Sequence, residues 1–161
     1  MSEKSPLKKQ ALSPDIWTEE KAAAPSVAPA PEVLDERINL ALRAASEKKA
    51  LHLTTLDLRE IATFTDYFVI ASGTNLRQVQ AISDGVEREL KKQLQIHPAR
   101  IEGYATAEWV LLDYGDFVVH VFEEQARQFY DLERLWRDAR PVAVPLDLAG
   151  EPVTITLRSD A

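Results

Sequence analysis

The residues of this sequence that could do chemistry gather around Gly115 and Asp116. Gly-Asp is a two-residue turn signal, and the runs on either side are apolar and β-prone, which predicts a hairpin. In the register that this turn sets, Asp113 and His120 are diagonal neighbours on one face, about 7–8 Å apart at Cβ or somewhat less. A carboxylate and an imidazole at that spacing could act as an acid–base pair or share a metal ion.

Metal-assisted nucleotidyl or phosphoryl transfer would need two or three carboxylates around one ion, and Asp57, Asp66 and Asp116 are the candidates beside Asp113. These acids come from separate segments without a local ligand motif, and the sequence has no nucleophile elbow, P-loop or G-x-G-x-x-G. The other interpretation of His120 is a hydrogen-bonded structural residue on an apolar strand. A metal-dependent nucleotidyl- or phosphotransferase using Asp113 and His120 therefore stands as the alternative function.

The same register divides the hairpin into two faces. One face is entirely apolar and is expected to face the core: Val110, Leu112, Tyr114, Phe117, Val119 and Val121. The other face combines large apolar groups with the acid and the imidazole: Trp109, Leu111, Asp113, Val118, His120 and Phe122. This second face needs a cover, either a helix of the same chain or a partner, and tryptophan is a common interface anchor. Glu108, Asp113 and Asp116 at its rim would favour a basic partner.

Two amphipathic helices are expected to position this hairpin. Their apolar stripes are Leu34, Ile38, Ala41, Leu42 and Ala45, then Val79, Ile82, Val86, Leu90 and Leu94. Lys48 and Lys49 would lie in the last turn of the first helix, where cations suit the helix dipole. Asn75 is the expected N-cap of the second, with Gln78 at capping-box spacing, and the dipeptide His97-Pro98 ends it.

Two strands are predicted between these helices, and a last helix after the hairpin. Residues 51–58 alternate with a slip at Thr54-Thr55 that indicates a bulge, whereas 66–72 form an apolar run typical of a strand buried on both faces. The Ser72-Gly73-Thr74 turn before the second helix could also hold an anion on its backbone N–H groups. The last helix carries Phe129, Leu132 and Trp136 on one stripe. This order predicts a single α/β (α+β) domain, a mixed β-sheet flanked by helices.

Composition sets the limits of the chain's organisation. The 161 residues carry a net charge of −7, 45% are hydrophobic and none is cysteine, which argues against thiol chemistry and binding to DNA. Residues 1–31 hold five of the nine prolines and are expected to be a disordered Pro/Ala-rich tail. The domain is predicted at 33–140, and 141–161 as an extension, flexible or forming an edge strand through Val153, Ile155 and Leu157. Without a signal peptide or apolar span, we expect a cytoplasmic protein without membrane contact.

Three blocks of sequence resemble the ribosomal silencing factor family (RsfS, also called Iojap). The first runs Thr65-Asp66-Tyr67-Phe68-Val69-Ile70-Ala71-Ser72-Gly73-Thr74-Asn75 and continues with Arg77-Gln78-Val79 and Ala81-Ile82. The second is Glu102-Gly103, then Trp109-Val110-Leu111-Leu112-Asp113-Tyr114-Gly115-Asp116 and Val118-Val119-His120-Val121-Phe122. The third is Phe129-Tyr130-Asp131-Leu132-Glu133-Arg134-Leu135-Trp136. Together they cover residues 35–138 in the family's order.

The resemblance implies a translation repressor rather than an enzyme, with no cofactor. Members of the family bind ribosomal protein L-fourteen on the large subunit and block an intersubunit bridge, so that the small subunit cannot join when nutrients are limiting. They are commonly homodimers when free. Their fold resembles nucleotidyltransferases without the catalytic acids, and here Ser72-Gly73 reverses the Gly-Ser of that pattern. The partner-binding residues carried over are Trp109, Leu111, Asp113, Tyr114, Gly115, Asp116 and His120.

The resemblance gives Trp109 a specific expected role. Trp109 and its neighbours would fill an apolar patch on the basic ribosomal protein, while the acidic rim of the hairpin meets its Lys and Arg side chains. On this hypothesis Trp109→Ala costs at least about 2 kcal/mol of binding and leaves the fold intact.

Overall fold

The computed structural model of the chain describes residues 35–144. The predicted tail at 1–31, Leu34, and the predicted edge strand around Val153, Ile155 and Leu157 lie outside the described residues.

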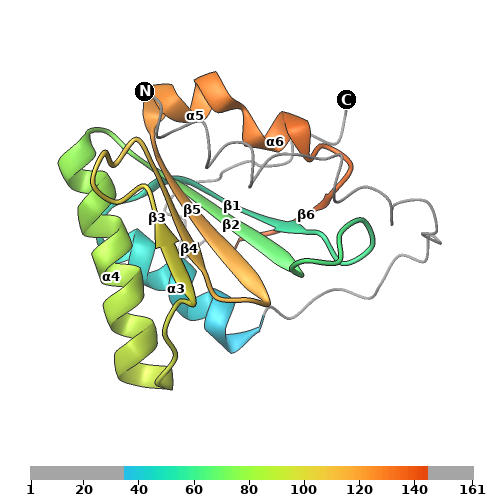
Figure 1. Cartoon of the computed structure of the whole chain (residues 1–161), viewed down its shortest axis with the longest axis horizontal. Helices are drawn as coiled ribbons and strands as arrows, with labels where there is room; N and C mark the ends of the chain where they lie inside the picture. The colour runs from blue at the N-terminus through green and yellow to red at the C-terminus, as the bar shows by residue number, and fades with distance from the viewer. Residues whose placement is uncertain (1–34, 145–161) are drawn as a thin grey trace.

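The described residues form one mixed sheet of six strands, which confirms the expected α+β architecture (Figure 1). The strands are β1 Leu51–Asp57, β2 Tyr67–Gly73, β3 Arg100–Glu102, β4 Trp109–Asp113, β5 Phe117–Glu123 and β6 Arg140–Val142. Their order across the sheet is β3-β4-β5-β2-β1-β6, and the central β2–β5 pair is parallel whereas the other pairs are antiparallel. Strand β6 contains Pro141 and Val142, which lie beyond the predicted boundary at residue 140.

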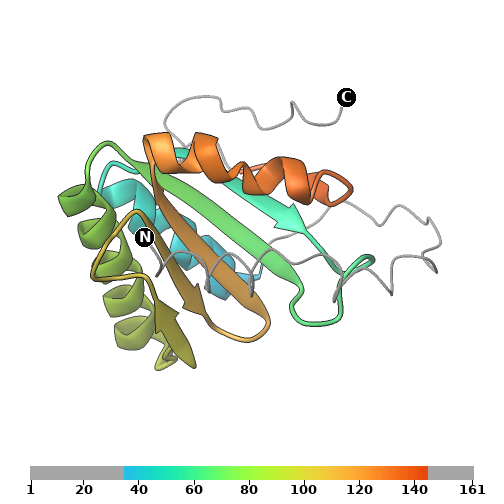
Figure 2. The same ribbon diagram turned by 45° about the horizontal axis from the view of Figure 1, so that its top comes forward.

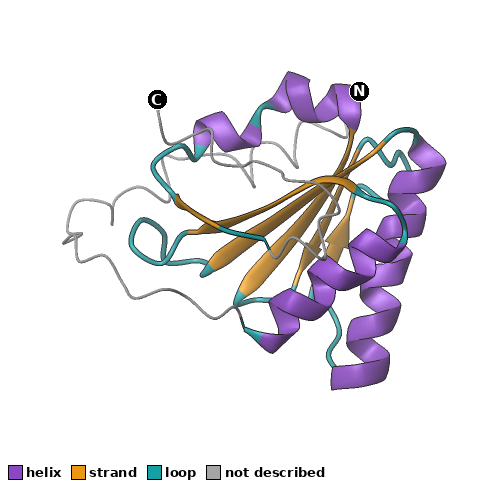
Figure 3. Ribbon diagram, turned by 180° about the vertical axis from the view of Figure 1, so that it is seen from behind, coloured by secondary structure: helices purple, strands orange, loops and turns teal. Residues whose placement is uncertain are grey.

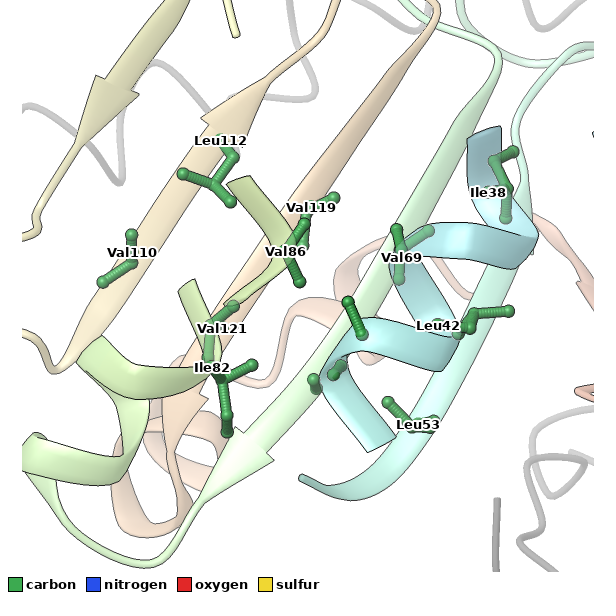
Figure 4. Packing of buried hydrophobic residues seen from close by; sticks show 14 of the residues in the cluster. Ile38, Leu42, Leu53, Val69, Ile82, Val86, Val110, Leu112, Val119 and Val121 are labelled. Carbon is green, nitrogen blue, oxygen red and sulfur yellow. The ribbon is translucent and has the colours of Figure 1, made fainter. Parts of the chain in front are cut away.

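Helices cover both faces of the sheet (Figure 2, Figure 3). They are α3 Glu36–Glu47, α4 Leu76–Leu94, α5 Glu124–Tyr130 and α6 Leu132–Leu135. Helices α3 and α4 bury their apolar stripes on one face, against side chains that include Val69, Val110 and Val119 (Figure 4). Helices α5 and α6 close the other face through Ala126 and Leu132, in a second and separate apolar cluster. The described residues therefore build two cores, one on each side of the sheet.

The first helix follows its predicted stripe but ends earlier than expected. Ile38, Ala41, Leu42 and Ala45 are buried as predicted, and the Asp35 side chain caps the N-terminus by accepting a hydrogen bond from the Arg37 backbone N–H. The prediction that Lys48 and Lys49 lie in the last turn is wrong, because α3 ends at Glu47. Lys48 is the C-cap, and Lys49 leaves the helix in a left-handed conformation with φ of 66°.

The predicted irregularity in β1 is confirmed as a shift of pairing register with β2. Leu51 pairs with Ser72 and Thr54 with Ile70, so two residues of β1 stand against one of β2 between these pairs. The shift lies at His52, whose φ is 51°, slightly before the Thr54-Thr55 step that the sequence indicated. The bulge turns the His52 carbonyl out of the regular ladder, where another group binds it, as described below.

The turn into α4 has its expected cap, and this cap bears on the anion hypothesis. Asn75 accepts a hydrogen bond from the Gln78 backbone N–H at 2.8 Å, while Gln78 Oε1 accepts from the Thr74 N–H at 2.7 Å. A Cβ on Gly73 would lie 3.1 Å from Val79 Cγ2, so this glycine permits close packing of the strand against the helix. The Thr74 donor that could have held an anion is therefore bound by Gln78.

The closing helix is divided into two. Asp131, with φ of 49°, separates α5 from α6. Leu132 and Trp136 are buried as predicted, but the prediction for Phe129 is wrong, because its side chain is 74% exposed. Ala126 and Tyr130 are the residues of α5 that face the sheet, and Phe129 is rotated about 100° away from Tyr130 around the helix.

Within residues 35–144, none of the helices combines the length and the apolar character needed to cross a bilayer.

Candidate partner-binding site at the β4–β5 hairpin

The hairpin that contains the predicted site residues has the register expected from its sequence. Trp109 pairs with Phe122, Leu111 with His120, and Asp113 with Val118, and each of these pairs agrees with the prediction. The Tyr114 N–H donates to the Phe117 carbonyl at 2.9 Å, which closes the two-residue turn. Gly115 has φ of 90°, a conformation that a glycine adopts without strain.

The face that contains Trp109 is covered by the chain's own helices. The indole lies with ring centroids 4.9 Å from Phe122 and 4.9 Å from Tyr130 of α5. Trp109 is 2% exposed and Leu111 is 4% exposed. The sequence allowed two covers for this face, a helix of the same chain or a partner, and the structure shows the helix. Trp109 is therefore a core residue.

This burial corrects the expectation that Trp109→Ala would leave the fold intact. Truncating a buried tryptophan leaves a cavity and costs about 3–5 kcal/mol of folding free energy, comparable to much of a domain's stability. A loss of binding in that variant would therefore not report on direct contact alone.

His120 lies beneath the same cover and is fully buried. Its Nδ1 accepts a hydrogen bond from Trp109 Nε1 at 3.0 Å, which assigns the imidazole proton to Nε2. The Phe68 ring packs edge-on against it at 4.4 Å between centroids. Burial lowers the pKa of His120 to about 3, because the charged imidazolium would lose its hydration, so the residue is neutral at physiological pH. The histidine thus orients the Trp109 indole.

Asp113 is held by other groups than His120. Its Oδ1 accepts a hydrogen bond from the Gly115 N–H at 2.9 Å, and its Oδ2 lies 3.7 Å from Arg100 Nη2 on β3. Its role is to brace the turn, as aspartate commonly does beside a glycine. The structure therefore does not place Asp113 and His120 together as an acid–base pair.

Asp57, another of the candidate acids, also has partners of its own. The buried Asp57 carboxylate forms ion pairs of 2.8 Å with both Arg59 and Arg140. These arginines outweigh the effect of burial and hold the pKa of Asp57 below its usual value. Among residues 35–144, no group of three or more His, Cys, Asp or Glu side chains is arranged to hold a metal ion.

The tip of the hairpin is anchored to the loop before β2 and to α3. Thr65 Oγ1 donates to the Gly115 carbonyl at 2.8 Å, and the Asp66 N–H donates to the Asp116 carbonyl at 2.9 Å. The Asp116 side chain is 65% exposed and lies 3.2 Å from Arg37 Nη1. The predicted acidic rim is therefore a surface of acids with neighbouring arginines, held on a fixed turn.

Tyr114 occupies an intermediate position on the other face of the hairpin. Its ring stacks on Phe117 with 4.9 Å between centroids and packs against the α3–α4 core. Burial and the nearby Glu87 carboxylate raise the pKa of Tyr114, so its hydroxyl stays protonated. The expectation from register that Tyr114 belongs to the core side is confirmed.

Sequence reasoning missed Arg127 of α5, which connects the cover to the sheet. Its Nη1 donates to the carbonyl of His52 in the β1 bulge at 2.8 Å and to Ser72 Oγ at 2.7 Å. Its Nη2 donates to Thr54 Oγ1 at 3.1 Å and to Glu133 Oε2 at 2.6 Å. A lone arginine on a helix carries no sequence signal for this role, because its acceptors on β1 and β2 are 55 to 75 residues away in the sequence.

Known proteins with similar sequence and structure are consistent with these findings. The family described as "Ribosomal silencing factor during starvation" matches residues 31–158. The protein named ribosomal silencing factor RsfS of Halalkalibacterium halodurans is 44% identical over 110 residues, which is 66% of this chain and 91% of that protein. The protein of the same name from Bacillus subtilis is 42% identical over 105 residues, 63% of this chain and 86% of that protein.

A solved structure from Bacillus halodurans superposes with a TM-score of 0.60 at 40% sequence identity, covering 67% of this chain and 97% of that chain. Sequence and fold thus point to the same family. The chain belongs to the ribosomal silencing factor family, RsfS or Iojap.

Proposed function

We propose that this chain represses translation by binding ribosomal protein L-fourteen on the large ribosomal subunit. In that position it blocks an intersubunit bridge, and the small subunit cannot join, above all when nutrients are limiting. The observation that carries the proposal is the family match over residues 31–158. In this role the chain works as a binding protein and needs neither catalysis nor a cofactor.

The proposed contact surface is the exposed part of the hairpin. Asp113, Tyr114, Gly115 and Asp116 form its tip, and all four are at least partly accessible. The buried residues carried over from the family, Trp109, Leu111 and His120, support this surface from beneath. Their contribution to binding is then to hold the strands at a fixed position, so that the tip meets its partner without a cost of ordering.

Charge supports a basic partner for this surface. Asp116 forms an ion pair of 3.2 Å with Arg37 on the surface. An exposed pair of this kind contributes little energy, so a lysine or arginine of the partner can replace Arg37. Once bound, a protein with a net charge of −7 would also repel the RNA of an approaching small subunit. Repression on this proposal combines steric exclusion with electrostatic repulsion.

Three further properties complete the proposal. The protein acts in the cytoplasm, where ribosomes assemble on messenger RNA, and it is a homodimer when free. Its sheet and helices form a nucleotidyltransferase-like fold without the catalytic acids.

Co-sedimentation with separated ribosomal subunits, followed by a subunit-joining assay, tests the proposed function. We expect the protein to sediment with large subunits and to reduce joining in proportion to occupancy. Binding to small subunits alone, or binding to large subunits without any effect on joining, would contradict the proposal.

A variant at the tip tests the proposed surface. Asp116→Lys reverses the exposed charge and places it beside Arg37, and we expect at least about tenfold weaker binding to large subunits. Glu47→Lys is the matched control, since this exposed acid lies at the opposite end of α3 from Arg37. Equal effects of the two substitutions would show that overall charge, rather than the hairpin tip, determines binding.

The metal-dependent transferase remains a measurable alternative. Its test is the thermal shift produced by Mg²⁺ or Mn²⁺ with a nucleoside triphosphate. A clear stabilisation that Asp113→Asn abolishes would favour the transferase over the repressor.

A further inference from the structure

The two faces of the sheet are covered by helices of unequal length. On one face α3 has 12 residues and α4 has 19, whereas on the other α5 has seven and α6 has four (Figure 2). We call the shorter pair the α5–α6 cover, and it leaves large apolar side chains at the surface. Phe129 is 74% exposed and Leu135 is 38% exposed. The outer side of this cover is therefore a candidate surface for docking.

Phe129 and Leu135 lie on the same flank of the α5–α6 cover. Phe129 follows the buried Ala126 by three residues, and Leu135 follows the buried Leu132 by three. Each exposed side chain is therefore turned about 60° from the buried one, in the same direction. Because α5 and α6 follow each other end to end along the sheet, the two side chains border one side of it (Figure 2).

The chain itself carries an acidic apolar sequence that fits this surface. It is the Trp17 segment, Leu12-Ser13-Pro14-Asp15-Ile16-Trp17-Thr18-Glu19-Glu20, which precedes the described residues. The segment holds three large apolar residues, three acids and no base. Trp17 is the one aromatic residue before α3, and tryptophan is a common anchor of interfaces. The segment therefore suits an apolar surface with positive charge beside it.

Charge favours the α5–α6 cover for this segment. The exposed charged side chains of residues 124–138 are two bases, Arg134 and Arg137, and one acid, Asp138. The exposed Tyr104 on the α4 side of the sheet, by contrast, donates its hydroxyl to Asp84 at 3.0 Å, so an acid lies beside it. Exposed charges of this kind guide a segment with three acids to the cover and contribute little to stability.

The start of α3 and the end of α6 lie at the same end of the sheet. Arg37 in the first turn of α3 is 3.2 Å from Asp116, and the Asp116 carbonyl accepts from the Asp66 N–H at 2.9 Å. Two residues before Asp66, the Phe64 ring lies 6.0 Å from the ring of Trp136, the C-cap of α6. A chain that precedes α3 therefore reaches the cover around this end of the sheet.

The connection between the Trp17 segment and α3 is long enough for this path. Residues 21–34 lie between them and include three prolines. An extended proline-rich stretch of that length spans about 40 Å, which is more than the diameter of about 35 Å of a domain of this size. The connection therefore sets no geometric obstacle to docking on the cover.

We propose that the Trp17 segment docks on the outer side of the α5–α6 cover of its own chain, with Trp17 against Phe129 and Leu135. A sequence with few anchors binds weakly by itself, but its attachment supplies an effective concentration in the millimolar range. The docked segment lies over the helix whose Tyr130 ring packs at 4.9 Å on Trp109. This inference goes beyond the proposed function, because it concerns a surface other than the hairpin tip and holds whether or not the chain binds ribosomes.

Paramagnetic broadening of amide NMR signals in the full chain tests the docking. The sequence has no cysteine, so Thr18→Cys gives a single attachment point for a nitroxide label beside Trp17. We expect the label to broaden the amide signals of the cover, including those of Gln128 and Leu135. The signal of Lys92, at an exposed site of α4 on the opposite face, should stay sharp. Equal broadening over the whole surface would overturn the proposal.

Variants in the labelled chain identify the contact. Phe129→Ser changes an exposed side chain, and Trp17→Ser removes the anchor of the segment. We expect each to lower the paramagnetic relaxation rate at Gln128 at least about threefold, because each removes a main apolar contact. Leu76→Ser is the matched control, an exposed apolar residue at the start of α4, and should leave the rate unchanged. Circular dichroism checks that the variants fold.

The remaining outcomes decide which molecule occupies the surface. Broadening of the cover signals that persists in both Phe129→Ser and Trp17→Ser would overturn the contact. A mixture of spin-labelled chains and isotope-labelled chains without a spin label tests the origin of the segment. We expect the cover signals to stay sharp in this mixture. Broadening there would assign the surface to the Trp17 segment of another copy and would overturn docking within one chain.

Discussion

The hydrogen bond between Trp109 and His120 fixes two large rings in the buried space between the sheet and α5. The Trp109 Nε1–His120 Nδ1 distance is 3.0 Å, and both side chains are buried between β4, β5 and α5. A bond of this kind contributes modestly when formed, but an unpaired buried group costs about 1–3 kcal/mol. At this scale the pair determines where the indole ring lies, and with it the position of the strand that leads to the tip.

Substitutions at Trp109 separate the bond from the packing. Trp109→Phe keeps most of the apolar contact but leaves His120 Nδ1 without its donor, and we expect a loss of about 1–3 kcal/mol in unfolding free energy. Trp109→Ala should cost about 3–5 kcal/mol because it also leaves a cavity. Urea denaturation of the variants measures both, and an unchanged stability of Trp109→Phe would mean that the hydrogen bond has no separate role.

The buried neutral His120 predicts how stability depends on pH. Its pKa is about 3 in the folded chain and about 6.5 when unfolded, so the unfolded chain binds the proton first as pH falls. Its contribution is fully present above pH 6.5 and is lost between there and pH 3, at about 1.4 kcal/mol per pH unit. Urea denaturation at pH 7, 6 and 5 measures the slope.

A variant provides the control for this pH dependence. His120→Gln retains an acceptor for the Trp109 indole and does not titrate, so the loss between pH 7 and 5 should be smaller than in the wild type. His97→Gln, at an exposed site after α4, makes the same chemical change and should leave the stability curve as it is. An unchanged slope in His120→Gln would contradict the assignment.

The elements show how far the sequence alone could lead. The hairpin register was predictable because a two-residue turn allows one pairing of the two strands. The apolar stripes of α3 and α4 were predictable because the helical period repeats over several turns. The positions of β3 and β6 could not be predicted, because a strand of three residues such as Arg140–Val142 is too short to show a period. No glycine or proline in the sequence marks the break between α5 and α6 at Asp131.

The site was harder to predict for a physical reason. Periodicity shows that residues 126–136 have a buried side, but it does not show which sheet face that side covers. The sequence therefore leaves open whether Trp109 contacts a helix or a partner. The answer depends on the direction in which the chain leaves β5. Arg127 sets that direction through acceptors on β1 and β2, which local sequence does not reveal.

Arg127 should therefore be the residue on which the attachment of α5 depends. The guanidinium is 11% exposed and Glu133 is 21% exposed, so Arg127→Met leaves a mostly buried carboxylate unpaired and should cost about 3 kcal/mol, the low end for such pairs. Hydrogen exchange should rise first in α5 and at the β1 bulge. Arg134→Met, an exposed position on α6, is the control and should change neither measurement.

At the scale of the whole molecule, the two cores and all the carried-over site residues lie within residues 35–144. Residues 1–31 contribute four basic and four acidic side chains, so their removal leaves the net charge at −7. We expect deletion of 1–31 to change the affinity for large subunits by less than about threefold, since charge steering is preserved. Co-sedimentation across a salt series measures this, and a larger loss would place part of the binding surface in that segment.

The parallel pairing of β2 with β5 has a consequence during synthesis of the chain. Tyr67 pairs with Phe117 and Gly73 with Glu123, so the central strand β2 waits for a partner that is translated fifty residues later. Until then the nascent chain presents an apolar strand edge in the middle of the future sheet, with β1, α3 and α4 as the neighbours of β2 that are already synthesised. The newborn protein therefore passes through a stage open to aggregation, which ends when the hairpin leaves the ribosome.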